Sequence, residues 1–479
     1  MHRIYLFCSY KEKLFFTLVF SFLKCYSNFS EVLGSFMLKV LTIIFVAVGL
    51  NAFASEISIK LPSALTEDDF RPVNVDEAAL GQLLFYDPIL SGNKEVACAT
   101  CHHPKLGTGD GLSLSLGDGG KGLGVKRVVD QNNLPEQRVP RNAQPLFNLG
   151  AKQIKTLFHD GRVEVDTSRP SGLRTPLEDE MVSGFASIIS AQTMFPVLSA
   201  DEMAGHYSEN EISEAVRRGV LTGENGAWAL IAKRVASIDE YSNHFYRIYK
   251  HINDPNDIKF TDISNAIAAF MEFEWRSDTA PFDEFLRGKT TFSGLPENGM
   301  ELFYGEAKCV RCHSGALFTD QEFHAMGQPQ LGPGKAARFQ NNSRDEGRFR
   351  VTGVDTDKYA FRTPSLRNVV LTGPWGHAGA YSNLFDFVSG HLDPLSAIKN
   401  YNRSSAVLTD FDTLDWAIMD DPLEISAIKK SIKMEAVSLS RNDVNALVAF
   451  LETLTDTTAQ RGRLGIPKSV PSGLKVPNP

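Results

Sequence analysis

The chain has 479 residues, of which 43% are hydrophobic and 22% charged, and its formal net charge is −8. This length allows two domains of ordinary size, each with its own buried core. The acidic balance disfavours nucleic acid as a partner and suits a small basic protein.

The first 54 residues have the pattern of an export signal behind an extension. Residues 37–54 begin with Met, carry one Lys, continue through an apolar run and end in small residues at Ala52 and Ala54. This is the pattern of a Sec-type signal peptide cleaved after Ala54. We interpret residues 1–36 as a non-native upstream extension, because a signal peptide normally opens its chain. An uncleaved membrane anchor is the alternative, but the apolar runs are shorter than a membrane span requires.

Cleavage changes the charge and the cysteine content. The whole chain has 49 basic and 57 acidic residues, and the first 54 positions hold five of the basic and two of the acidic ones. The remaining chain therefore has 44 basic and 55 acidic residues, a net charge of −11. Two of the six cysteines, Cys8 and Cys25, are also removed. An oxidising compartment would pair any spare thiol, and the four cysteines that remain all belong to one kind of motif.

That motif is Cys-x-x-Cys-His, the attachment site of a c-type haem, and it occurs at residues 98–102 and 309–313. Two thiols at this spacing can each bond one haem vinyl group, and the adjacent histidine then binds the iron. A zinc ribbon would place its cysteine pairs much closer together. We therefore predict two covalent haems and, since such haems are attached outside the cytoplasm in bacteria, a periplasmic protein. The haem-binding residues are Cys98, Cys101, His102, Cys309, Cys312 and His313.

The segment before each haem motif repeats. Residues 81–86 and 299–304 both read G-x-x-L-F-Y in a helical context. This indicates two tandem cytochrome-c-like domains, which we place at residues 55–275 and 276–479. Two unrelated amphipathic helices would be the alternative explanation.

Other segments also favour helix, so we predict a mainly α fold. Apolar residues recur at helical spacing over residues 210–221, 225–238 and 260–273. Ser440 begins a capping-box pattern before another amphipathic run. Residues 117–122 formally match G-x-G-x-x-G, but the βαβ context of a dinucleotide site is missing, and we interpret them as a flexible loop beside the first haem.

In order along the chain, these and further motifs resemble the bacterial dihaem cytochrome c peroxidase family, which includes the MauG-type enzymes. The resemblance runs from about residue 80 to residue 455. It rests on residues 98–102, 141–143 (Arg-Asn-Ala), 158–162 (Phe-His-Asp-Gly-Arg), 281–283 (Pro-Phe-Asp), 309–313, 362–368, 372–377 and 449–454.

The resemblance implies that the first haem iron has a free coordination position, whereas the second iron is bound by protein side chains on both sides. His102 would be the ligand of the first iron, whose far side is blocked in the peroxidases by a histidine of the following loop. This chain has no histidine between His103 and His159, so we expect an open iron, as in the MauG-type branch. His313 would bind the second iron, and the family's far ligand, Met or Tyr, falls at His391. Neutral imidazole binds iron well, and Met326 and Met434 are the fallback ligands.

Two further residues are assigned catalytic roles by the resemblance. Peroxide cleavage needs a group that moves a proton from one peroxide oxygen to the other, and the family's Glu-Met pair matches Glu202 and Met203, with Glu178 and Glu180 as rivals. The family usually has a Trp between its haems, where this chain has His159. Imidazole is harder to oxidise than indole, so we expect electrons to tunnel past His159 without a radical on it.

The resemblance also implies calcium, held by the side chain of Asn142 and the carbonyls of Thr372 and Pro374. The sequence thus predicts a periplasmic dihaem enzyme that reduces hydrogen peroxide with electrons from a small redox protein, a cytochrome c or a cupredoxin, and it leaves a homodimer open. A MauG-like oxidase of a partner protein and a non-catalytic dihaem electron carrier are the alternatives.

Overall fold

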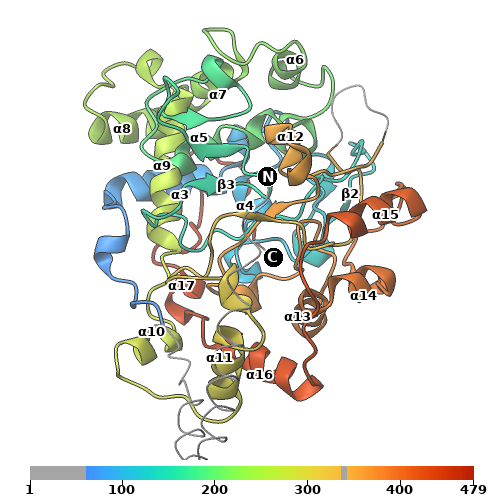
Figure 1. Ribbon diagram of the computed structural model, residues 1–479. Helices are drawn as coiled ribbons and strands as arrows, with labels where there is room; N and C mark the ends of the chain where they lie inside the picture. Colours follow the sequence, from blue (N-terminus) through green and yellow to red (C-terminus); the bar gives the residue numbers. More distant parts are fainter. Residues whose placement is uncertain (1–60, 336–341, 479) are drawn as a thin grey trace, which may run out of the picture. The chain divides into compact units, whose positions relative to one another are not determined.

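The computed structural model describes residues 61–335 and 342–478. The predicted extension and signal peptide, residues 1–36 and 37–54, lie outside the described residues. The described part is mainly helical, as predicted (Figure 1). Within it, no helix is both long and apolar enough to cross a membrane.

The helices fall into two groups along the chain, and each group surrounds one of the two haem motifs. The first group is α3 (Val75–Tyr86), α4 (Cys98–Cys101), α5 (Ile188–Thr193), α6 (Glu211–Arg217), α7 (Ala227–Ala236), α8 (Asp239–Ile248) and α9 (Phe260–Glu274). The second group is α10 (Pro281–Leu286), α11 (Leu295–Tyr304), α12 (Phe349–Thr352), α13 (Leu384–Leu392), α14 (Pro394–Lys399), α15 (Pro422–Ser431), α16 (Arg441–Glu452) and α17 (Thr457–Arg461).

The strands are short and antiparallel. One sheet pairs β1 (Gly120–Lys121) with β2 (Val128–Val129), and another has the order β3 (Thr156–Leu157), β4 (Val163–Val165), β5 (Leu173–Arg174). The last sheet pairs β6 (Phe323–His324) with β7 (Phe361–Arg362). The loop with the G-x-G-x-x-G pattern therefore contains only the two-residue strand β1 and no dinucleotide-binding unit.

The repeated G-x-x-L-F-Y segments pack in the same way in both halves of the chain. Helix α3 crosses α9 at Gly81, where an added Cβ would lie 1.8 Å from the carbonyl oxygen of Ala266. Helix α11 crosses α16 at Gly299, where an added Cβ would lie 1.8 Å from the carbonyl oxygen of Ala446. Each glycine is thus the only residue type that lets the two helix backbones approach this closely.

The aromatic residues of the repeat match as well. The rings of Phe85 and Phe270 lie 5.2 Å apart in the first helix pair, and those of Phe303 and Phe450 lie 5.2 Å apart in the second. All four rings are buried, and each pair belongs to a separate hydrophobic cluster. The internal repeat that the sequence indicates is therefore present in the packing. The domain division at residues 275 and 276 stays a prediction.

The other predicted helices form with small shifts at their ends. The run 210–221 gives only α6, because the chain turns at Gly219 with a φ of 73°. Helix α16 begins where the capping pattern predicts it, since the Ser440 Oγ accepts a hydrogen bond from the Asp443 N–H at 3.2 Å and an Asp443 oxygen accepts one from the Ser440 N–H at 2.9 Å.

The C-terminal segment 462–478 packs against residues of the first half of the chain. The buried carboxylate of Glu274 on α9 accepts hydrogen bonds from the backbone N–H groups of Arg463, Leu464 and Gly465 at 2.9, 2.6 and 2.8 Å. Farther along, the Ser472 hydroxyl donates to Asp87 at 2.6 Å. No periodicity in the sequence predicts these contacts.

Candidate haem sites

At the first haem motif the two thiols and the histidine are arranged by one helical turn. Helix α4 carries Cys98 and Cys101, and the N–H of His102 donates to the carbonyl of Cys98 at 2.9 Å. The Nδ1 atom of His102 lies 3.0 Å from the carbonyl oxygen of Thr108. A carbonyl at this nitrogen fixes the proton on Nδ1 and leaves Nε2 as the metal-binding atom.

The second motif repeats this arrangement. The N–H of His313 donates to the carbonyl of Cys309 at 2.9 Å, and its Nδ1 lies 3.1 Å from the carbonyl oxygen of Phe318. The cysteines of both motifs are free thiols. Each site therefore offers two unbonded thiols and one histidine oriented through Nδ1, which is the donor set that a covalent haem requires.

A cavity of about 1190 Å³, its open mouth included, lies against the first motif. Cys98, Cys101 and His102 line it together with Glu202 and His159. Most of the remaining lining is apolar and includes Phe85, Leu90, Val96, Leu146, Phe158, Val197, Phe260 and Ile267. The structure thus brings together the residues that the sequence assigns to the first haem and to proton transfer, although they come from segments about one hundred residues apart.

Glu202 lies on a single π-helical turn, Ala200–Ala204, an element that often occurs at functional sites. Burial raises the pKa of the Glu202 carboxyl, while the nearby cations Lys335 and Arg162 oppose this shift. The rival carboxylates Glu178 and Glu180 are exposed on a surface turn and do not line the cavity. Of the three candidates, Glu202 alone lines the cavity beside the first haem motif; its catalytic role stays a prediction.

Several cavity residues escaped the sequence reasoning. Arg162 belongs to the motif 158–162, but its position in the cavity wall depends on the fold. Lys335 comes from a long loop without any motif, and burial lowers its pKa to about 8. Met271 also lines the cavity, as does Met203 of the Glu-Met pair already matched in the sequence. Both side chains carry thioether sulfurs, which are iron ligands in other haem proteins. Only the three-dimensional structure brings these side chains together.

His159 is partly buried in the cavity wall, with its Nε2 3.2 Å from the carbonyl oxygen of Asn142. Burial lowers the pKa of this ring to about 3, and the positive charge of Arg141 adds to the effect. The imidazole is therefore neutral. Its expected role between the haems stays a prediction.

His391 lies on α13, and its Nδ1 is 3.1 Å from the carbonyl oxygen of Phe387. It is thus oriented through Nδ1 as His102 and His313 are. The two rings of the predicted second site are close enough for His391 to contribute to lowering the pKa of His313, to about 4, although burial is the larger cause. The fallback ligand Met434 is 40% exposed. The ligand assignment itself stays a prediction.

The side chain of Asn142 is held by two backbone carbonyls, and its calcium assignment, with Thr372 and Pro374, stays a prediction. Its Nδ2 donates to the carbonyl oxygens of Leu112 and Ser113 at 2.9 and 3.3 Å, which turns its Oδ1 away from those two carbonyls. A different group of donors, Cys312, Asp320 and His324, lies within 4.8 Å of one another. This group is no separate metal site, because haem attachment would convert the Cys312 thiol into a thioether.

A buried ion network is centred on Arg141, which lines the cavity. The Nε and Nη2 of Arg141 donate to the carboxylate of Asp345 at 2.7 and 2.8 Å, and its Nη1 lies 2.7 Å from an oxygen of Asp160. All three side chains are at most 6% exposed. The network joins the motifs around residues 141 and 160 to a loop of the second half of the chain.

Known proteins resemble this chain in sequence over most of its length. Residues 75–291 match the family model of the di-haem cytochrome c peroxidases. The methylamine utilization protein MauG of Methylorubrum extorquens is 28% identical over 395 residues, which cover 82% of each chain. The cytochrome c551 peroxidase of Pseudomonas aeruginosa is 26% identical over 358 residues, 74% of this chain and 83% of that protein.

Solved structures share the fold. A MauG-like protein associated with microbial copper homeostasis matches 85% of this chain and 96% of its own, with a TM-score of 0.52 and 23% identity. The diheme peroxidase BthA from Burkholderia thailandensis matches 86% of this chain and 92% of its own, with a TM-score of 0.51 and 19% identity. Together with the two haem-binding motifs and their matching geometry, these comparisons show that the chain is similar to the di-haem cytochrome c peroxidases, with residues 75–291 matching the family model.

Proposed function

We propose that this chain is a dihaem peroxidase that reduces hydrogen peroxide to water with electrons from a small redox protein. The observation that carries the proposal is the shared cavity of His102 and Glu202. A covalent haem held by Cys98, Cys101 and His102 would supply the redox-active iron. A proton-transferring carboxyl then faces the same space, which is otherwise largely apolar.

Glu202 performs the proton transfer in this proposal. As a carboxylate it accepts the proton of one peroxide oxygen, and it returns that proton to the other oxygen, so that water leaves in place of hydroxide. The apolar lining excludes bulk water from the exchange. Arg162 and Lys335 stabilise the ionised carboxylate, as the opposing effects on its pKa indicate.

The second site relays electrons. Cys309 and Cys312 would hold its haem covalently and His313 and His391 would bind the iron, and this group would supply electron transfer at the second site. We also propose that His159, in the wall of the cavity beside the first motif, would lie between the two haem sites. We also propose the periplasm as the location, domains at 55–275 and 276–479, and calcium bound by Asn142, Thr372 and Pro374.

The test is peroxide consumption by the haem-loaded protein with a small organic electron donor. Glu202→Gln should lower kcat/KM by about 100- to 10,000-fold, the usual contribution of a general acid–base group. Glu180→Gln, at the exposed rival position, should leave the rate unchanged. The proposal is wrong if the two variants behave alike.

The pH dependence gives a second readout. Because burial raises the pKa of Glu202, its carboxylate form is lost as the pH falls through that raised pKa. The rate should therefore rise with pH through an inflection above about 4.3, the ordinary value for glutamate. That inflection should be missing in Glu202→Gln.

A further inference from the structure

In one long surface segment of the second half of the chain, every charged side chain is a carboxylate. Residues 404–428 contain six carboxylates and no Lys or Arg. Asp415 and Glu424 are buried and paired with Arg138 and Arg344, and Asp420 pairs with Arg403 at the surface. Asp410 and Asp412 are exposed. The segment therefore presents negative charge to solvent.

The same segment exposes apolar side chains. Leu414 is 81% exposed and Leu423, at the start of α15, is 79% exposed. Trp416 lies two residues after Leu414 and is half-buried. Exposed apolar residues beside charges of one sign are typical of a surface that binds a partner of opposite charge.

Behind Trp416 a file of aromatic rings leads into the protein. The ring centroids of Trp416 and Tyr401 lie 6.2 Å apart, and those of Tyr401 and Tyr381 lie 5.4 Å apart. Tyr381 contacts Phe387 at 5.7 Å. Phe387 contacts the ring of His391 at 4.4 Å on the same helix, α13. Figure 1 shows α13, α14 and α15 together on the side of the molecule that carries this file.

Polar contacts hold the file in place. The Tyr401 hydroxyl donates to the carbonyl of Ala380 at 2.6 Å, and the guanidinium of Arg403 lies 5.0 Å from the centre of the Trp416 ring. The rings thus connect a half-buried indole to the predicted ligand of the second haem without a gap between neighbours. Because electron tunnelling weakens steeply with each gap, contiguous rings favour transfer along this line.

We propose that residues 404–428 form the docking surface for a small basic redox protein, and that Trp416, Tyr401, Tyr381 and Phe387 conduct its electrons to the haem held by His313 and His391. The identity of the final acceptor, hydrogen peroxide, rests on the proposed function. Two donor molecules each lose one electron, and one peroxide gains two electrons and two protons to give two waters.

The route moves electrons alone. Burial raises the pKa of Tyr381 to about 12 and also raises that of Tyr401, so both phenols keep their protons. Phe387 serves as a tunnelling bridge. The protons of the reaction are supplied at the first site, where Glu202 lies.

The test is anaerobic stopped-flow reduction of the second haem of the holoprotein by reduced mitochondrial cytochrome c, a basic protein, without peroxide. Trp416→Leu should slow this reduction about tenfold, and Trp416→Phe, which keeps a ring, should restore most of the rate. Asp410→Asn with Asp412→Asn should lower the second-order rate constant about threefold at low salt and weaken its salt dependence. Reduction by dithionite, which needs no docking, should be the same in all variants.

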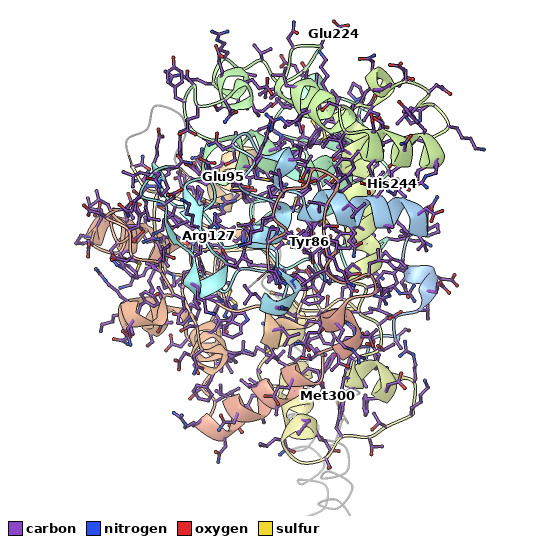
Figure 2. The ribbon with its side chains drawn as sticks, turned by 180° about the vertical axis from the view of Figure 1, so that it is seen from behind. Tyr86, Glu95, Arg127, Glu224, His244 and Met300 are labelled. Carbon is purple, nitrogen blue, oxygen red and sulfur yellow. The ribbon has the colours of Figure 1, made fainter. Side chains whose placement is uncertain are left out.

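A matched control removes two exposed charges elsewhere. Glu224→Gln with Glu240→Gln should leave the cytochrome c rate unchanged, since Glu224 lies at the α6–α7 end of the molecule (Figure 2), away from α14 and α15. The proposal is overturned if cytochrome c reduces Trp416→Leu as fast as wild type. It is also overturned if the Asp410/Asp412 double variant and the Glu224/Glu240 double variant change this rate equally. Peroxide turnover with the small organic donor separates this proposal from the proposed function. If wild type does not consume peroxide but the variants still slow haem reduction by cytochrome c, the peroxidase function is wrong and the electron route is retained.

Discussion

Replacing Arg141 with methionine should strongly destabilise the protein. The substitution keeps the volume and removes a charge that contacts Asp345 at 2.7 and 2.8 Å and Asp160 at 2.7 Å. Both carboxylates are at most 4% exposed. The substitution would leave Asp345 buried without its cation and Asp160 with Arg162 alone, 3.8 Å away. Breaking a buried ion pair in this way costs about 3 to 5 kcal/mol of unfolding free energy.

The assay is guanidinium chloride unfolding of the holoprotein, followed by circular dichroism. Arg218→Met is the matched control, because Arg218 is 70% exposed in its ion pair with Glu214, and the loss of such a pair costs less than about 1 kcal/mol. Equal destabilisation by the two substitutions would refute the structural role of the network.

The network also predicts how the difference depends on pH. Arg141 lowers the pKa of Asp160 to about 2 and lowers that of Asp345 as well. A lowered carboxyl pKa stabilises the fold above the unfolded value of about 3.9, and this contribution is lost as the pH falls toward the folded value. The gap in stability between wild type and Arg141→Met should therefore narrow between about pH 5 and pH 2.

Two other predictions concern the fold. Gly81→Ala and Gly299→Ala should each destabilise the protein by about 1 to 3 kcal/mol, because the new methyl group would meet the backbone of the facing helix; unchanged melting temperatures would contradict the close helix crossing. Deleting residues 463–479 should lower the unfolding free energy by about 3 kcal/mol, since the buried carboxylate of Glu274 loses three N–H donors. Deleting only residues 475–479 should have a much smaller effect, and comparable losses from the two deletions would show that the Glu274 contacts contribute little.

Local sequence patterns predicted the features that depend on neighbouring residues. The haem motifs, the cap at Ser440 and the amphipathic run of α9 all work through residues within one or two turns of helix, so their spacing carries the information. The repeat at Gly81 and Gly299 was visible for the same reason. Its cause, a close approach to Ala266 and Ala446, became clear only from the packing.

The cavity residues depend on contacts between distant segments, and the sequence held less information about them. Glu202 was assigned through the family resemblance across a loose alignment, and the fold puts it in the wall of the same cavity as His102. Lys335 and Met271 belong to no motif, and no pattern marks them as neighbours of the first haem motif. The return of the C-terminal segment to Glu274 uses backbone N–H groups, which every residue but proline has.

The account depends on an asymmetry between the two irons, and the EPR spectrum of the resting ferric holoprotein tests it most directly. We expect a high-spin signal from the first haem, bound only by His102, and a low-spin signal from the second, bound by His313 and His391. In His391→Ala the low-spin signal should disappear. A wild-type spectrum without any high-spin signal, as ligation by Met203 or Met271 would produce, or a low-spin signal that survives His391→Ala, would contradict the account.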